Sequence, residues 1–123
     1  MRPVERGPAP RAFTDYQDAR DPLIQRIGDY CSYCENALHS GVHVEHVQPK
    51  SLSPEAELDW ANFLLACEYC NSTKGHTAIQ IDQYFWPDCD NTFRAFDYEL
   101  DRPPSVSNGL NSQQREIAQR TLV

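Results

Sequence analysis

The sequence predicts a small α+β protein whose limited apolar core is supported by a bound metal. Two short stretches, residues 41–47 and 63–66, have the composition of paired strands, and helical patterns precede and follow them. Two Cys-x-x-Cys pairs flank the strands: Cys31/Cys34 and Cys67/Cys70. The 123-residue chain has nine prolines and a mean hydropathy of -0.66, so its apolar core is expected to be modest.

Residues 1–11 are rich in Pro, Gly and Arg, a composition that favours a disordered arm. A single domain is expected over residues 12–123, with its core at about 28–78 and a C-terminal extension at 79–123. The sequence has neither an apolar run long enough to cross a bilayer nor a secretory signal. We therefore expect a soluble, cytoplasmic protein, in which paired cysteines bind metal more often than they form disulfides.

Charge is distributed unevenly along the chain. The net charge is -7, yet residues 1–26 contain five Arg and only four acidic residues, so the excess negative charge belongs to residues 27–123. Nucleic-acid-binding proteins usually carry a basic surface, because much of their affinity comes from neutralised phosphates. Any contact with nucleic acid is therefore expected to be local, mediated by a metal, or supplied by a partner protein.

The first helix is predicted to begin at Asp21-Pro22, with Asp21 as N-cap and Pro22 in the first helical position. Thr14 and Asp15 are suited to cap a short turn before it. The helix has one apolar face, made of Leu23, Ile24, Ile27 and Tyr30.

The first strand-like stretch alternates apolar and polar side chains. On a regular strand His46 is buried with Val42 and Val44, whereas His43 and Glu45 face outward. Either the strand ends near Glu45 or His46 lines a pocket.

Pro49 prevents a central strand from continuing, so residues 48–59 are expected to form a loop. The apolar run 63–66 is then the partner strand. A short helix is expected at 68–74, because Gly75 is a natural stop signal.

In the C-terminal part, residues 92–99 have an imperfect alternation that predicts a strand, and Asn111 or Ser112 is suited to cap a final helix. An aromatic group precedes them: Tyr84, Phe85 and Trp86. Such a group packs in a core or interface, or stacks on single-stranded bases, and the scarcity of nearby basic residues favours packing.

The four paired cysteines match the ligand set of a structural Zn²⁺ site, in which four thiolates leave no open position. Free thiols and an iron–sulfur cluster are the alternatives. The 32 residues between the pairs exceed the gap of a compact zinc ribbon, so they are expected to have a function of their own. Cys89 lies between two aspartates and is expected to be a free thiol.

Within this insertion, Glu45-His46 is expected to face the start of the helix that carries Asn71. Carboxylate and amide oxygens are hard ligands suited to an ion such as Mg²⁺, which retains waters and also takes phosphate oxygens. A neutral His46 can accept a proton from water. The three residues thus have the chemistry of an open second metal site. Solvated side chains, or a helix cap at Asn71, are the alternative.

Lys50 and Lys74 can each reach a phosphate, or can simply be solvated. Asn62 is expected to brace the loop before it by side-chain hydrogen bonds. The remaining histidines are interpreted as structural, surface or supporting residues: His39, His43 and His76.

Four strings of the sequence together resemble the zinc-containing HNH endonuclease family: CSYCE (31–35), VEHVQPKS (44–51), DWANFLLAC (59–67) and CNSTKG (70–75). The resemblance implies a ββα-metal, treble-clef-like core with flanking helices, which hydrolyses phosphodiester bonds in DNA. It also implies that His46 is the general base, with Asn62 as the middle Asn and Asn71 in the third position. Glu45 stands where the family has Asp or Glu, and Glu45 and Asn71 are implied to bind the catalytic divalent metal, Mg²⁺ or Mn²⁺.

A looser resemblance over residues 28–123 is to HNH proteins associated with retrons and Septu-type anti-phage systems. It includes YCSYCE (30–35), a D-rich stretch and an F-x-Y string after the HNH strings. Those relatives tend to be longer, and Septu-type nucleases work beside an ATPase. The resemblance therefore implies a role in anti-phage defence together with a partner protein.

Two other classes of function remain open. One is a non-catalytic zinc module that binds nucleic acid or protein, and the other is a redox or iron–sulfur protein. The intact set of Glu45, His46 and Asn71 favours a nuclease over the zinc module.

Overall fold

The computed structural model describes residues 1–37, 42–74 and 80–122. The chain forms two compact units, one made of Val4–Ile79 and the other of Met1–Pro3 together with Gln80–Val123. No helix among the described residues has the length and apolar character needed to span a membrane.

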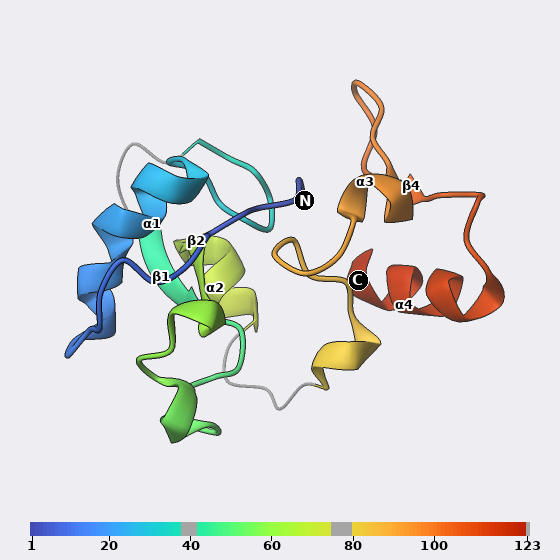
Figure 1. The fold of residues 1–123 in the computed structure, drawn as a ribbon. Coiled ribbons are helices and arrows are strands. Elements are labelled where there is room, and N and C mark those ends of the chain that lie inside the picture. The colour runs from blue at the N-terminus through green and yellow to red at the C-terminus, as the bar shows by residue number, and fades with distance from the viewer. Residues whose placement is uncertain (38–41, 75–79, 123) are drawn as a thin grey trace. The chain divides into compact units, whose positions relative to one another are not determined.

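The first unit is built on a two-stranded antiparallel sheet (Figure 1). β1 (Val42–His46) pairs with β2 (Phe63–Cys67) in a register that places Glu45 opposite Leu64 and His46 opposite Phe63. α2 (Glu68–Lys74) follows β2 directly. The predicted strands and short helix are thus confirmed, in the order β–β–α.

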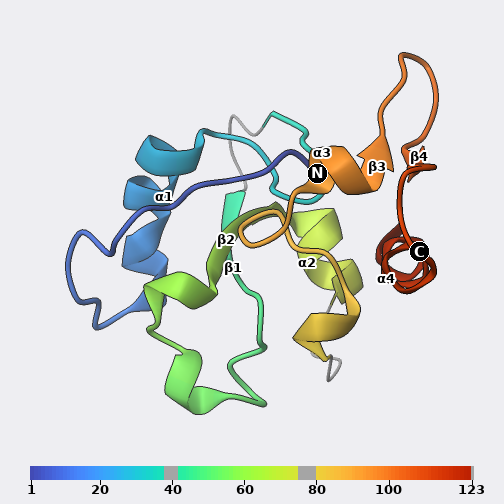
Figure 2. The same ribbon diagram turned by 45° about the vertical axis from the view of Figure 1, so that its right-hand side comes forward.

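A helix packs on each face of this sheet. α1 (Arg20–Ile27) lies on one side and α2 on the other, as both ribbon views show (Figures 1 and 2). α1 continues from a short 3₁₀ helix, η1 (Tyr16–Ala19), whose cap is Asp15, with its carboxylate accepting from the backbone N–H of Gln17 at 3.0 Å. The predicted cap at Asp15 is therefore confirmed, whereas Asp21 lies inside the first turn of α1 because η1 runs straight into it.

The core of the first unit lies between α1 and the sheet. Leu23 of α1 and Phe63 and Leu65 of β2 have no exposed surface. Other apolar side chains close this core: Phe13, Ala19, Val42 and Trp60, with Tyr16, Ile24, Ile27 and Val44 packed at its border. Each large apolar side chain buried in this way contributes about 1.5–3 kcal/mol. The core thus fixes β1 and β2, and with them the residues at the strand ends.

The N-terminal arm has no helix or strand, and from Val4 onward it belongs to the first unit. Val4 is buried, and the Arg6 guanidinium donates a 2.7 Å hydrogen bond to the carbonyl of Phe63. The indole N–H of Trp60 donates to the carbonyl of Gly7. Within the stretch predicted to be a disordered arm, residues 4–7 thus contact the first unit in this structure, where their backbone and side-chain groups pair with those of Phe63 and Trp60.

The loop between the two strands contains two 3₁₀ turns, η2 (Pro54–Ala56) and η3 (Trp60–Asn62). Asp59 caps η3 by accepting from the N–H of Ala61. The loop expected over residues 48–59 is confirmed, and both of its ends are held by hydrogen bonds.

The second unit has its own small core of Ala95, Phe96, Leu110 and Ala118. Its elements are η4 (Ile81–Gln83), α3 (Thr92–Ala95), β3 (Phe96–Asp97), β4 (Ser105–Val106) and α4 (Ser112–Leu122).

Two predictions for the second unit have different outcomes. The strand predicted over 92–99 is wrong for its first half, because Asn91 caps α3 by accepting from the N–H of Arg94. The predicted cap of the final helix is confirmed. The side chain of Asn111 accepts from Gln114 N–H, and Gln114 Oε1 accepts from Asn111 N–H.

Candidate functional site

The four paired cysteines meet at the junction of β2 and α2. Their Sγ atoms all lie within 4.8 Å of one another, and those of Cys34 and Cys67 are 3.8 Å apart. Thiolates bound tetrahedrally at about 2.3 Å from Zn²⁺ are separated by about 3.8 Å. The residues therefore fit a closed four-cysteine zinc site, as predicted. Cys89 is exposed and is not part of this cluster.

Two thiols of this cluster, those of Cys34 and Cys70, resist ionisation when no cation is near. Burial raises the pKa of the Cys34 and Cys70 thiols, and the neighbouring sulfur atoms raise both further. Four thiolates in this small volume would repel one another strongly. Zinc binding must therefore release protons, and it supplies the positive charge that lets the four sulfurs share one site.

Glu45 is buried at the end of β1, with 3 % of its surface exposed. The prediction that it faces outward is wrong, because α2 packs against β1. Its Oε1 atom lies 3.0 Å from the Nζ atom of Lys74. Burial raises the pKa of Glu45, and the nearby Lys74 ammonium partly offsets the rise.

Among the described residues, none donates a hydrogen bond to the second carboxylate oxygen of Glu45, Oε2, although that atom is buried. A buried carboxylate oxygen without a donor is costly, so a bound cation there would stabilise it.

His46, the last residue of β1, is buried between aromatic rings. The centroid of its ring lies 4.7 Å from that of Tyr16 and 5.4 Å from that of Phe63, both in edge-on geometry. Its Nε2 atom is 2.9 Å from the backbone carbonyl of Glu57. Because a carbonyl oxygen can only accept, Nε2 must carry the proton, and the lone pair of a neutral His46 is on Nδ1.

The protonation of His46 is set mainly by its burial, which lowers its pKa. The positive charges of Lys50 and Lys74 add to this effect, while the Glu57 carbonyl opposes it. At neutral pH the ring is therefore in the form that accepts a proton.

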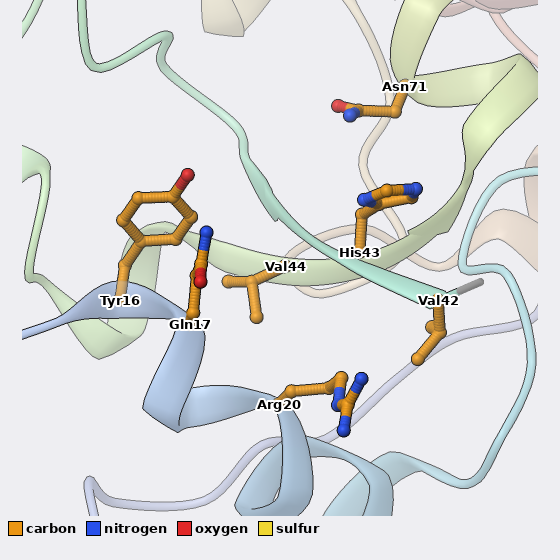
Figure 3. Close-up of a pocket in the computed structure, with 7 residues that line it drawn as sticks. All are labelled: Tyr16, Gln17, Arg20, Val42, His43, Val44 and Asn71. Carbon is orange, nitrogen blue, oxygen red and sulfur yellow. The ribbon is translucent and has the colours of Figure 1, made fainter. Parts of the chain in front are cut away.

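A pocket of about 530 Å³ lies beside β1, between η1 and α1 on one side and α2 on the other. Figure 3 shows His43 pointing toward Asn71 of α2, while Val42 and Val44 point to the opposite face. On the other side, η1 and α1 contribute Tyr16, Gln17 and Arg20 to the lining of the pocket. None of the described lining residues is acidic, in a chain with 18 acidic residues.

A family model covers the segment that contains β1, β2, α2, the four paired cysteines and the Glu45-His46 pair. Residues 31–77 match the HNH endonuclease family model. No curated protein matches the chain. The predicted fold class is confirmed, an α+β fold with an HNH core and four cysteines placed to bind zinc. The HNH segment, residues 31–77, supports a nuclease function in general.

The HNH segment also offers oxygen ligands to a divalent ion. Glu45 Oε2 is buried without a donor, and Asn71 lines the adjacent pocket. These hard oxygen donors fit Mg²⁺ or Mn²⁺. In the described part of the chain, the cysteines form the only close group of three or more His, Cys, Asp or Glu ligands. An ion at Glu45 therefore needs water or substrate oxygens to complete its shell.

Asn62 braces the strand-connecting loop of the HNH segment. Its Oδ1 accepts from the N–H of Gln48 at 2.8 Å, and its Nδ2 donates to the carbonyls of Gln48 and Ala56. The prediction that Asn62 holds this loop is confirmed. Because Ala56 precedes Glu57, these bonds also steady the carbonyl that orients His46.

The two lysines of the HNH segment make contacts within the protein. Lys74 pairs with Glu45, and Lys50 Nζ lies 3.1 Å from the Tyr16 hydroxyl and 4.2 Å from the centre of its ring. Neither lysine lines the pocket, and their predicted role in binding phosphate remains a prediction.

Sequence reasoning missed the contribution of η1 and α1 to this site. Tyr16 and Arg20 precede the HNH segment, and both line the pocket. The excess of arginine over acidic residues before residue 27 was the available signal. His43, expected to be a surface or supporting residue, is exposed and also lines the pocket.

Proposed function

We propose that the chain is a metal-dependent endonuclease that hydrolyses phosphodiester bonds in DNA, with His46 as the general base. One observation supports this most strongly. The Glu57 carbonyl fixes the protonated nitrogen of His46, beside a buried Glu45 whose Oε2 has no donor among the described residues. This arrangement lies within a segment that matches the HNH endonuclease family.

In the proposed mechanism, His46 takes a proton from the attacking water on Nδ1. The Glu57 carbonyl accepts from Nε2–H before and after this transfer, so it holds the ring in place and stabilises the imidazolium that forms. Tyr16 and Phe63 restrict rotation of the ring from two sides. Burial keeps the pKa of His46 below its usual value, so the base is neutral at pH 7.

Glu45 and Asn71 would hold the divalent ion in this mechanism. Such an ion polarises the scissile phosphate and stabilises the leaving oxygen. Glu45 is well suited to this role, because β1 fixes its position and α2 excludes water around it. Asn71 adds a neutral oxygen donor, so the ligand set keeps a net charge of only -1.

The pocket beside β1 is the proposed binding site of the DNA strand. Its described lining lacks acidic groups and contains the Arg20 guanidinium, and its Tyr16 ring lies against His46. Arg20 Nε lies 3.6 Å from the exposed carboxylate of Asp21, so a phosphate would have to compete with that carboxylate for the guanidinium. A local cation of this kind supports phosphate binding in a chain with a net charge of -7. Gln17 and Asn71 add amide groups that can hydrogen-bond to phosphate or sugar oxygens.

Arg20→Ala is expected to weaken DNA binding about fivefold, since an exposed charged contact is worth about 1 kcal/mol. Binding is measured by fluorescence anisotropy of labelled DNA in a His46→Ala background, so that cleavage does not interfere. Arg102→Ala, in the second unit, is the matched control and should leave affinity unchanged. Equal affinities for both variants would exclude the pocket as the DNA site.

The proposed activity is tested by incubating the zinc-loaded chain with supercoiled plasmid, a single-stranded oligonucleotide and RNA. We expect nicked or linear plasmid after addition of Mg²⁺ or Mn²⁺, and intact plasmid without them. Intact plasmid under every condition, including addition of the partner protein proposed below, would favour the alternative, a zinc module that binds nucleic acid or protein without cutting.

We further propose that a partner protein, an ATPase of an anti-phage system, brings this nuclease to its substrate. Acidic residues outnumber basic residues in 27–123, which supports a need for a partner that binds the DNA. The looser resemblance to Septu-type proteins supports the same need. The products of neighbouring genes are to be co-purified with the chain, and cleavage is compared with and without them. Equal cleavage by the isolated chain would contradict the proposal.

A further inference from the structure

Lys74 makes two contacts that hold its ammonium at the end of β1. Its Nζ atom lies 3.0 Å from Glu45 Oε1 and donates a 2.9 Å hydrogen bond to the backbone carbonyl of His46. Lys74 is the last residue of α2, and its side chain is 15 % exposed, compared with 4 % for Glu45. The ammonium is thus largely withdrawn from water and bound to the carboxylate proposed as a metal ligand.

The carboxylate of Glu45 needs a positive charge close to it. Burying an ionised carboxylate is costly unless an opposite charge compensates for the lost hydration. Lys74 supplies this charge in the structure, and a divalent ion on the same carboxylate would supply it as well. Two cations bound to one carboxylate would lie within a few ångströms of each other, where low dielectric makes their repulsion strong.

We propose that Lys74 and the divalent metal compete for Glu45, so that metal binding releases the Lys74 ammonium from the carboxylate. The inference rests on the proposed function at one point, the binding of a divalent ion by Glu45. The lysine neutralises the site before the metal binds. Its flexible four-carbon stem then lets the released ammonium turn toward phosphate oxygens.

The hydrogen bond to His46 adds to this competition. When Lys74 leaves Glu45, it also withdraws its donor from the partly buried carbonyl of His46. Metal binding has to offset the loss of both contacts. The affinity of the wild-type chain for the metal is therefore lower than its oxygen ligands alone would give.

The competition is tested by titrating the zinc-loaded full chain with Mn²⁺ and measuring free Mn²⁺ by electron paramagnetic resonance. Mn²⁺ prefers oxygen ligands and leaves the thiolate site to zinc. Lys74→Met keeps the length of the side chain without its charge, and is expected to tighten Mn²⁺ binding about tenfold or more. Lys74→Arg keeps the charge and should bind like the wild type, whereas Glu45→Gln should lose the site.

The outcomes separate this inference from the proposed function. Equal or weaker Mn²⁺ binding by Lys74→Met, with binding intact in the wild type, overturns the competition alone. Absence of Mn²⁺ binding in both proteins overturns the metal assignment of the proposed function, and the competition with it.

A second measurement uses the wild-type chain and does not depend on the folding of a variant. The chain has two lysines, so its lysine side-chain NMR spectrum contains two Nζ signals, assigned with Lys50→Arg. Addition of diamagnetic Mg²⁺ is expected to shift the Lys74 signal toward that of a solvated ammonium. The Lys50 signal, held at the Tyr16 hydroxyl, should stay in place. An unchanged Lys74 signal at saturating Mg²⁺ would overturn the competition.

Discussion

His46→Ala should reduce DNA cleavage by about 10²- to 10⁴-fold, the usual contribution of a positioned general base. The variant removes the proposed proton acceptor and leaves Glu45, Asn71 and the four cysteines in place. Cleavage is measured as the initial rate of plasmid nicking in Mn²⁺. Zinc content and circular dichroism are expected to match those of the wild type.

His46→Gln is the matched control for packing. Its side-chain amide can still donate to the Glu57 carbonyl, but it cannot accept a proton from water at neutral pH. It should therefore be as inactive as the alanine variant while retaining more of the wild-type stability. Cleavage at a rate near that of the wild type by either folded variant would remove His46 from the mechanism.

The same assignment predicts the pH dependence of cleavage. Burial lowers the pKa of His46 from its ordinary value of 6.5, so the imidazole remains neutral, and able to act as a base, below pH 6.5. The rate should fall only when the pH drops through this lowered pKa. Histidine NMR of the zinc-loaded chain measures the pKa of His46 directly and separates it from protonation of Glu45. A titration midpoint of His46 above pH 6.5 would contradict the assignment.

Removal of zinc should abolish the cooperative unfolding transition of the first unit. Structural zinc sites supply apparent free energies of about 10–16 kcal/mol at neutral pH, more than a small apolar core provides. The four cysteines join the turn after α1 to the junction of β2 and α2, so their release frees both ends of the HNH segment. Thermal unfolding by circular dichroism before and after chelation measures the loss.

Two variants test whether the effect comes from the proposed site. Cys67→Ser should bind less zinc and lose the thermal transition, because one of the four thiolates is missing. Cys89→Ser should retain both, since Cys89 lies outside the cluster. A chain that keeps its melting temperature after complete zinc removal would show that the apolar core suffices.

Much of the fold was predictable because local signals and tertiary structure agree. The paired cysteines, the strand stretches and the short helix before Gly75 each have a pattern that one structure satisfies. Where a prediction from local sequence was wrong, contacts with a neighbouring element determined the structure. Glu45 is buried because α2 covers its face of β1, and strand alternation contains no information about that cover. Similarly, residues 92–95 alternate like a strand but form the helical turn α3, because the side chain of Asn91 caps that turn.

The candidate site was predictable to a lesser extent. The HNH strings indicated Glu45, His46 and Asn71. They did not indicate that Lys74 pairs with Glu45, or that the Glu57 carbonyl accepts a hydrogen bond from the His46 ring. Those contacts depend on how the loop and α2 return to β1. Tyr16 and Arg20 reach the pocket through the packing of η1 and α1 against the sheet, an arrangement to which no motif points.

In the proposed mechanism, the hydrogen bond from His46 to the Glu57 carbonyl gives the loop between the strands a role that depends on a backbone atom. Its two halves should therefore differ in their tolerance of insertions. Ser51 and Leu52 are exposed, so extra residues there should be accepted. An insertion between Ala56 and Glu57 would instead displace the acceptor from the imidazole. Loop length in this chain should thus be constrained by one backbone oxygen rather than by the identity of the residues around it.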